Sequence, residues 1–303
     1  MSDTPPRMVG IGAVFIDDIV QPTGQTYMGR LGGGVVHALM GAALWGERPG
    51  IVAVAGEGLP NAAQQRLSRH LDTAGLRRLP IPQIRAWQIF EFDGTRRELY
   101  RVRETEPFTR GAGPELLPPH YRQSRGFYLL QGFEGMRAWR AALPGFVLWE
   151  PLQQAMTPGS RPALRQVLRD CRIDVISPNL AEAQAVYGLR SPEALIDALF
   201  EDGAQIVALR MGADGSLVAD RTAGLKQPVG TVYVEQIADQ TGAGNTYCGG
   251  LLAGLLQGRN LVEAAMMGAV SASFCIEHIG VLDPGQITAA ERSRRCAQLS
   301  KTV

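Results

Sequence analysis

The chain has 303 residues, of which 45% are hydrophobic, so it can bury a core in one large α/β domain or two smaller ones. Its 30 basic and 29 acidic residues leave a net charge of +1, which argues against nucleic acid or an anionic membrane as partners. Residues 1–7 lack an apolar signal core, and no apolar run approaches the roughly 20 residues that span a bilayer. We therefore expect a cytoplasmic protein.

The cysteines are widely spaced and include no C-x-x-C pair, which argues against a zinc site or a disulfide framework. We expect reduced thiols, with two of them packed in helices, Cys248 and Cys275.

Short apolar runs typical of buried strands alternate with helical patterns along the chain. The expected strands cover 8–14, 50–54, 127–130, 146–149, 174–176, 206–209 and 216–219. The expected helices cover 35–45, 62–74, 161–169, 180–187, 192–201, 243–257 and 262–278. This alternation predicts an α/β fold with a doubly wound parallel sheet and helices on both faces.

Two segments, 15–30 and 87–103, depart from this rhythm and have the alternating polar pattern of exposed strands. The Asp93-Gly94 pair is a hairpin signal. Together the segments predict a small sheet that stands off the main body. The arginines at 96, 97, 101 and 103 are interpreted as a solvated strand face, and a role in holding an acidic substrate is the less favoured alternative.

A glycine-spaced turn, DQTGAGNTYCGG at residues 239–250, opens directly into an apolar helical run. The first N–H groups of a helix have no partner within the helix, and glycines such as Gly242 and Gly244 let a phosphate approach the backbone. The alternative is an ordinary turn before a core helix. Because the turn opens directly into a helix, we favour a phosphate site.

Three further turns have a structural interpretation. The glycines of LGGGVVHA at 31–38 permit close helix packing around a half-buried His37. In SPNLAE at 177–182, Asn179 and Glu182 have the spacing of a capping box. RMGADGS at 210–216 is typical of a turn between two strands.

The run at 239–250 resembles the C-terminal signature of the ribokinase-like (PfkB) carbohydrate kinases, and the turns at 31–38, 177–182 and 210–216 resemble further elements of that family. The resemblance implies a single ribokinase-like domain over 1–303, with lid excursions at 15–30 and 87–103, and a kinase that uses ATP and Mg²⁺. It assigns substrate contacts to Asp17, Asp18, Gly33, Gly34 and His37, and nucleotide contacts to Asn179, Arg210, Gly212, Gly215, Asp239 and Thr241. It assigns Mg²⁺ to Glu182 and transition-state stabilisation to the N–H groups of Gly242, Ala243, Gly244 and Asn245.

Asn245 stands where that family places its catalytic aspartate. An amide cannot take the proton of the attacking hydroxyl, and such a base is typically worth about 10² to 10⁴ in rate. Phosphoryl transfer depends mainly on positioning and charge stabilisation, so activity is expected to be slow and not absent. His37 has a suitable intrinsic pKa for a substitute base. The G-A-G-N turn and the helix at 264–280 are similar to the fungal maintenance-of-killer branch of the family.

The resemblance implies a phosphotransferase that acts on a hydroxyl of a sugar or nucleoside-like small molecule. The alternatives are a pseudokinase that binds nucleotide or sugar and acts through a partner, and a two-subunit assembly in which the lid forms a homodimer interface. The sequence leaves the acceptor, the oligomeric state and any monovalent cation open.

Overall fold

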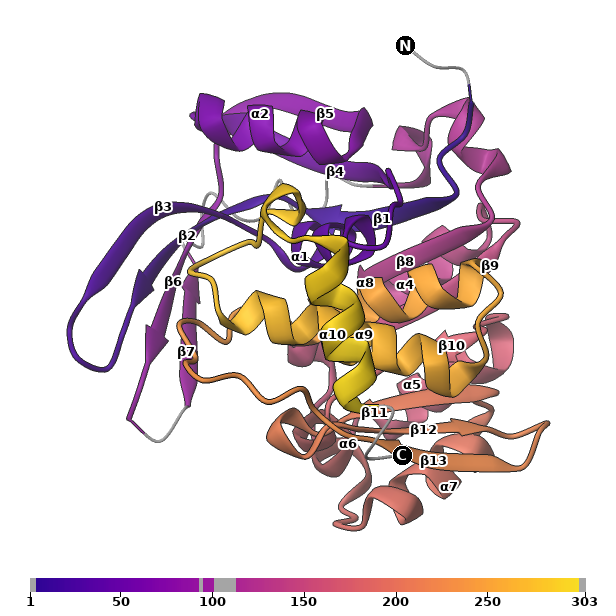
Figure 1. Ribbon diagram of the computed structural model, residues 1–303. Helices are drawn as coiled ribbons and strands as arrows, with labels where there is room; N and C mark the ends of the chain where they lie inside the picture. Colours follow the sequence, from indigo (N-terminus) through magenta and orange to yellow (C-terminus); the bar gives the residue numbers. More distant parts are fainter. Residues whose placement is uncertain (1–3, 93–94, 101–112, 300–303) are drawn as a thin grey trace.

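A nine-stranded mixed sheet runs through the middle of the computed structural model, which describes residues 4–92, 95–100 and 113–299 (Figure 1). The strand order is β13-β12-β11-β10-β9-β8-β1-β4-β5. Neighbours from β5 to β11 pair in parallel, and β12 and β13 are antiparallel additions. The strands are β1 (Met8–Ala13), β4 (Gly50–Glu57), β5 (Asp72–Pro82), β8 (Gly126–Gln131), β9 (Phe146–Pro151), β10 (Val175–Ile176), β11 (Ile206–Arg210), β12 (Ser216–Asp220) and β13 (Leu225–Val229).

Helices cover both faces of this sheet and define two hydrophobic cores (Figure 1). One core is formed with α1 (Gly34–Ala43), α2 (Asn61–His70), α8 (Ala243–Leu256), α9 (Leu261–Ile276) and α10 (Ala289–Leu299). The other is formed with α4 (Phe133–Arg140), α5 (Arg161–Asp170), α6 (Leu180–Tyr187) and α7 (Pro192–Asp202). The predicted doubly wound fold is confirmed.

Strand β1 shows why the sequence folds this way. Met8 belongs to one core while Val9 and Ile11 belong to the other, because successive strand side chains point to opposite faces. Gly10 lies against α1, where an added Cβ would come within 2.7 Å of Leu39. The glycine therefore brings α1 close to the sheet, and with it the turn that precedes α1.

A second sheet of four strands stands off the main body, at the left of Figure 1. It is built from β2 (Phe15–Val20), β3 (Thr26–Gly32), β6 (Arg85–Phe90) and β7 (Arg96–Tyr100), in the order β3-β2-β6-β7. We call it the lid sheet. The two excursions predicted from the sequence supply its strands, whereas the expected turn at Asp93-Gly94, Arg101 and Arg103 lie outside the described residues.

Several elements differ from the sequence-based expectation. The helix expected at 62–74 ends at His70, and the chain enters the edge strand β5. Helices α4 and α10 and strand β13 were not expected. They have exposed polar faces and lie at the periphery, so few of their residues are apolar and buried. In α10, for example, the buried residues are Arg295 and Leu299.

Cys171, Cys248 and Cys275 are buried thiols outside any disulfide, and Cys296 is partly exposed. Cys248 and Cys275 lie within α8 and α9, as expected. Within the described ranges, none of the helices has the length and apolar character needed to cross a bilayer.

Candidate active site

A cavity of about 600 Å³ lies between the carboxyl ends of the parallel strands and the lid sheet. Its walls include the ends of β1, β8, β9 and β11, the starts of α1 and α8, and the inner face of the lid. Open α/β sheets bind ligands at this edge, since the loops that follow neighbouring strands meet there. Of the residues assigned from the sequence, it gathers Asp17, Gly33, Gly34, His37, Asn179, Glu182, Arg210, Gly212, Thr241, Gly242, Ala243, Gly244 and Asn245.

The turn before α8 is held in a conformation that only glycine adopts easily. Gly242 has φ +74°, and an added Cβ would lie 2.1 Å from the ring of His37. At Gly244 the added Cβ would lie 2.0 Å from Nη1 of Arg210. The two glycines therefore let His37 and Arg210 pack directly against the turn. Residues 242–245 all line the cavity, so the first turn of α8 lies at its wall, where the free N–H groups of a helix start suit an anion.

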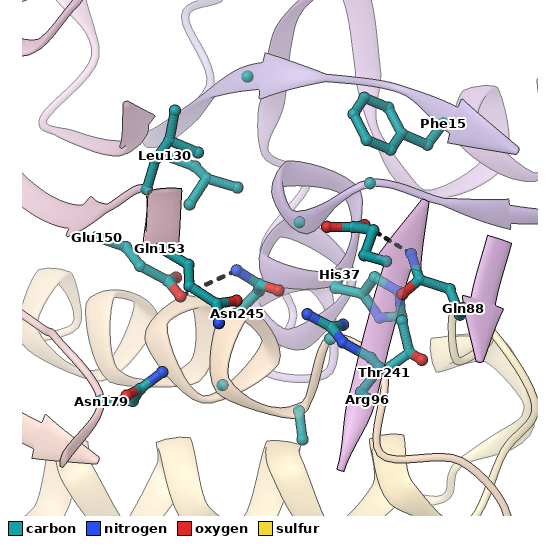
Figure 2. Close-up of a pocket in the computed structure, with 18 of the residues that line it drawn as sticks. Phe15, His37, Gln88, Arg96, Leu130, Glu150, Gln153, Asn179, Thr241 and Asn245 are labelled. Atoms are coloured by element: carbon teal, nitrogen blue, oxygen red, sulfur yellow. Dashed lines mark hydrogen bonds between the residues drawn. The ribbon is translucent and has the colours of Figure 1, made fainter. Parts of the chain in front are cut away.

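The side chain of Asn245 faces two oxygen groups, the Tyr128 hydroxyl and the Glu150 carboxylate, of which Figure 2 shows the carboxylate. Its Nδ2 donates to Oε1 of Glu150 at 3.0 Å and to the hydroxyl of Tyr128 at 3.3 Å. The Tyr128 hydroxyl in turn donates to Oε2 of Glu150 at 2.6 Å. Since both partners act as acceptors toward the amide, its oxygen points away from them, toward the side of the cavity where His37 lies (Figure 2).

Arg210 neutralises the Glu150 carboxylate. Its Nη1 lies 2.8 Å from Oε1 of Glu150, and its Nη2 donates to the Ser177 carbonyl at 2.9 Å and lies 3.9 Å from Glu182. Burial lowers the pKa of Arg210, but the neighbouring carboxylates more than offset this, so the side chain stays charged. The resemblance assigned Arg210 to nucleotide, as a fork that could pair with a phosphate, whereas both Nη atoms of the guanidinium have protein partners in the structure.

Asp17 and Asp18 are neighbours on β2, and the lid sheet separates their roles. Asp17 lines the cavity and accepts from Nε2 of Gln88 at 3.3 Å. Asp18 faces the opposite side, where it pairs with Arg85 at 2.6 Å and accepts from the Gly29 N–H. The sequence left open which of the two aspartates faces inward, and it is Asp17 that does, because adjacent strand residues point to opposite faces. Burial raises the pKa of Asp17 to about 7.

His37 lies on the floor of the cavity, fully buried beneath Gly242. Its Nδ1 is 3.7 Å from Sγ of Cys275, and its Nε2 has no partner in the described part of the chain. Burial lowers the pKa of His37 to about 4, so the imidazole is neutral and only weakly basic near pH 7. This argues against His37 as a substitute base, so contact with the substrate is the role that remains for it.

Asn179 and Glu182 form a complete capping box at the start of α6. Oδ1 of Asn179 accepts from the Glu182 N–H at 2.8 Å, and Oε2 of Glu182 accepts from the Asn179 N–H at 2.9 Å. The structural interpretation is thus confirmed, and both residues also line the cavity. Burial raises the pKa of Glu182.

The fit to Mg²⁺ can be judged from these donors. Among the described residues there is no cluster of three or more histidine, cysteine or acidic side chains of the kind that binds a metal by itself. Mg²⁺ usually keeps several waters and is held by one or two carboxylates with substrate phosphates, so a single carboxylate beside an anion turn fits. Glu182 meets that description.

A second, more apolar cavity of about 400 Å³ lies on the other side of the turn. The two cavities share Arg210, Gly212, Gln240, Ala243 and Gly244. Gly215 lines only the second cavity, next to Val232 and Tyr247. The α8 turn therefore stands between a polar cavity under the lid and an apolar cavity near β12.

The remaining assigned residues divide between the cavity wall and its support. Asp239 does not line either cavity: its oxygens accept from the N–H groups of Thr241 and Gly280 at 2.8 and 2.9 Å, which fixes the loop before α8. Its assignment to direct nucleotide contact is corrected to support of the loop.

The glycines before α1 line the cavity wall. Gly33 has φ +100°, and a Cβ on Gly34 would lie 2.9 Å from Nδ2 of Asn245, so the turn before α1 lies directly against Asn245.

Glu150 and Tyr128 were missed by the sequence reasoning. Glu150 lies at the carboxyl end of β9, where functional side chains gather, and Tyr128 lies in the middle of the neighbouring strand β8. The Glu150-Pro151 pair at the end of the expected strand 146–149 was the available signal, because a charged residue there departs from an apolar run.

The chain is similar to known sugar and nucleoside kinases. The family model described as pfkB family carbohydrate kinase matches residues 152–288. A cytidine kinase of Thermococcus kodakarensis is 28% identical over 276 residues, which cover 86% of this chain and 92% of that protein. The structure of an adenosine kinase from Sinorhizobium meliloti superposes with a TM-score of 0.78 at 19% identity, covering 96% of this chain and 100% of the other. That of an Arabidopsis thaliana ribokinase complexed with ribose and ATP gives 0.71 at 18% identity, covering 97% and 99%.

Proposed function

Since the family match and the ribokinase-like fold support a place among the pfkB carbohydrate kinases, we propose that this chain transfers a phosphoryl group from ATP to a hydroxyl of a nucleoside or sugar. The observation that carries the proposal is the position of the α8 turn between the two cavities. A donor in the apolar cavity and an acceptor under the lid would both reach the turn, so the phosphoryl group would cross at Gly244.

The residues around the turn suit this transfer. The N–H groups of residues 242–245 stabilise charge on the phosphoryl oxygens, and Glu182 with Asn179 would hold hydrated Mg²⁺, which neutralises the phosphates. Asp17 accepts hydrogen bonds from acceptor hydroxyls. Tests with added K⁺ would show whether the loop fixed by Asp239 needs a monovalent cation as well.

The lid end of the first cavity favours an acceptor with a flat, apolar part. Phe15 and Tyr100 form an edge-to-face pair there, with ring centroids 5.7 Å apart. Aromatic side chains of this kind pack well against a nucleobase. The similarity to a cytidine kinase over most of the chain agrees with this choice, so nucleosides are the first acceptors to test.

A thermal-shift screen of nucleotides, nucleosides and sugars would identify ligands, because binding to the native state raises its apparent stability. Each acceptor that shifts the melting temperature is then incubated with Mg-ATP, and formation of ADP and phosphorylated acceptor is measured. Acceptor-dependent product formation confirms the proposal. Nucleotide binding without transfer to any acceptor would favour the pseudokinase alternative, for which the missing carboxylate at Asn245 is the motivating observation.

We also propose that the outer face of the lid sheet pairs with a second copy of the chain. Met28, Trp87 and Leu99 are 58%, 45% and 50% exposed. Trp87 and Leu99 are directly opposite each other on β6 and β7. Large apolar side chains grouped on one sheet face favour association, and the same sheet covers the acceptor cavity. Self-association would thereby hold the lid sheet in place over the acceptor cavity.

A further inference from the structure

The Asn245 amide is held by a carboxylate that the sequence did not assign to the site. Glu150 is 5% exposed, and its two oxygens accept from Asn245 Nδ2, Arg210 Nη1 and the Tyr128 hydroxyl. A carboxylate can only accept hydrogen bonds, so it dictates that the amide turns its nitrogen inward. The oxygen of Asn245 is then fixed on the opposite side, within the cavity (Figure 2).

The same contacts exclude a second negative charge. In an Asn245→Asp variant an oxygen would take the place of Nδ2, 3.0 Å from Oε1 of Glu150. Two carboxylates at that distance cannot both ionise without a large cost, and one Arg210 cannot neutralise both. The residue type at 245 is therefore coupled to the residue type at 150.

We propose that Glu150 and Asn245 act as one unit, in which Glu150 is a positioning residue and Asn245 Oδ1 is the oxygen that receives the acceptor hydroxyl. This inference rests on the proposed kinase function. A hydrogen bond from the amide to a carboxylate polarises the amide and makes its oxygen a better acceptor. The hydroxyl is thereby held for attack: its oxygen bonds to the γ-phosphorus while the bond from that phosphorus to ADP breaks, and its proton passes to an oxygen of the transferred phosphoryl group. Positioning suffices for this step, because the loose transition state depends mainly on it.

The unit needs one carboxylate and one amide, and this can be tested by exchanging them. The variants are Glu150→Gln, Asn245→Asp and the double variant E150Q/N245D, which moves the negative charge from one position to the other and keeps the total. Turnover and KM are measured for the acceptor found in the screen, and thermal unfolding is measured without ligands at pH 8.

The turnover measurement tests the role of the Glu150 charge. Glu150→Gln keeps the shape of the site and removes the charge that polarises the Asn245 amide, so kcat should fall by about 10- to 100-fold. KM for ATP should change little. The double variant places a true base at 245 and should recover at least the wild-type kcat. Wild-type kcat in Glu150→Gln, or a double variant no faster than that single variant, would overturn the inference.

In the thermal unfolding measurement, the melting temperature of Asn245→Asp should lie several degrees below that of the wild type. Addition of Glu150→Gln should restore most of the lost melting temperature. Additive effects of the two substitutions would overturn the inference even if no acceptor were phosphorylated. Failure of the proposed function is distinct: it would appear as absence of transfer in the wild type and in every variant.

Two controls separate a positioning role from general effects. Asp202 is a buried carboxylate distant from the cavity with the same kinds of partner, Arg161 at 2.9 Å and the Tyr187 hydroxyl at 3.0 Å. Asp202→Asn should lower the melting temperature and leave kcat unchanged. Recovery of Glu150→Gln by tenfold more Mg²⁺ would show that Glu150 holds the cation, and the inference would be wrong.

Discussion

Gly244 and Arg210 are so close that no β-carbon fits between them. A Cβ built on Gly244 would lie 2.0 Å from Nη1 of the arginine, whose guanidinium is held by Glu150 and the Ser177 carbonyl. Gly244 is thus needed for two reasons: it opens the backbone to phosphate, and it leaves room for the guanidinium of Arg210 beside the turn.

Gly244→Ala is expected to displace Arg210 and to weaken binding of Mg-ATP by about 10-fold or more, roughly 1.4 kcal/mol. Calorimetry measures the affinity directly. Gly254→Ala is the matched control. Gly254 lies in α8, as Gly244 does, but away from the site, and its Cβ would lie 2.8 Å from Cα of Ala264 in α9. The control should cost about 1–3 kcal/mol of stability by overpacking and leave the affinity for ATP intact. Equal loss of affinity in both variants would contradict a local role for Gly244.

The central part of the fold could be predicted because it is buried. Strands such as β1 and β8 are apolar on both faces, and helices such as α8 and α9 are apolar over most of their surface, so their patterns are strong. β5 and α10 lie at the periphery with polar faces, and their packing is set by tertiary contacts that local patterns do not record.

The glycine turns of the site could also be predicted, because their spacing along the chain is local. The partners of Asn245 could not: Tyr128 and Glu150 are 117 and 95 residues away in sequence, and only the order of strands in the sheet brings them together. The choice between Asp17 and Asp18 likewise depends on the register of β2, which a run of two aspartates leaves undetermined.

His37 is expected to contribute to substrate binding and not to proton transfer. Its imidazole is buried, and its pKa of about 4 keeps it neutral between pH 6 and 8. His37→Asn should therefore raise KM for the acceptor, keep kcat within about 10-fold and leave the shape of the pH profile of kcat unchanged. A base would instead be worth about 10² to 10⁴ in kcat. A loss in that range, together with disappearance of a step in the wild-type pH profile, would restore the base interpretation.

The lid interface predicts a concentration-dependent dimer that one charge can separate. Trp87→Glu places a carboxylate in the middle of the apolar outer face, where Met28 and Leu99 are also exposed. Sedimentation velocity should show a dimer for the wild type and a monomer for the variant, with a raised KM for the acceptor because the lid is no longer held. Tyr233→Glu, at an 80% exposed position outside the lid, is the control and should leave the sedimentation coefficient unchanged. A monomeric wild type at all concentrations would refute the interface.

Asp17 gives the free protein a pH-dependent stability of unusual sign. Because burial raises its pKa from 3.8 to about 7, the folded state binds more protons than the unfolded state between these values. Stability should therefore decrease as the pH rises from about 4 to 7, the reverse of a carboxylate held in an ion pair. At one pKa unit per 1.4 kcal/mol, the full effect is up to about 4 kcal/mol.

Asp17→Asn should consequently be more stable than wild type at pH 8 and nearly equal to it at pH 4, as measured by urea unfolding at both values. Its KM for the acceptor should rise, since a neutral amide replaces the carboxylate that accepts the substrate hydroxyls. In the wild type the same KM should fall as the pH rises through 7, because the carboxylate must be ionised to act. Asp18→Asn is the matched control: it loses the ion pair with Arg85 and should be less stable than wild type at pH 8, with KM little changed. If Asp17→Asn were also less stable at pH 8, the carboxylate would have to be stabilised by contacts other than those seen, and the assignment of Asp17 as a destabilising residue kept for substrate binding would fall.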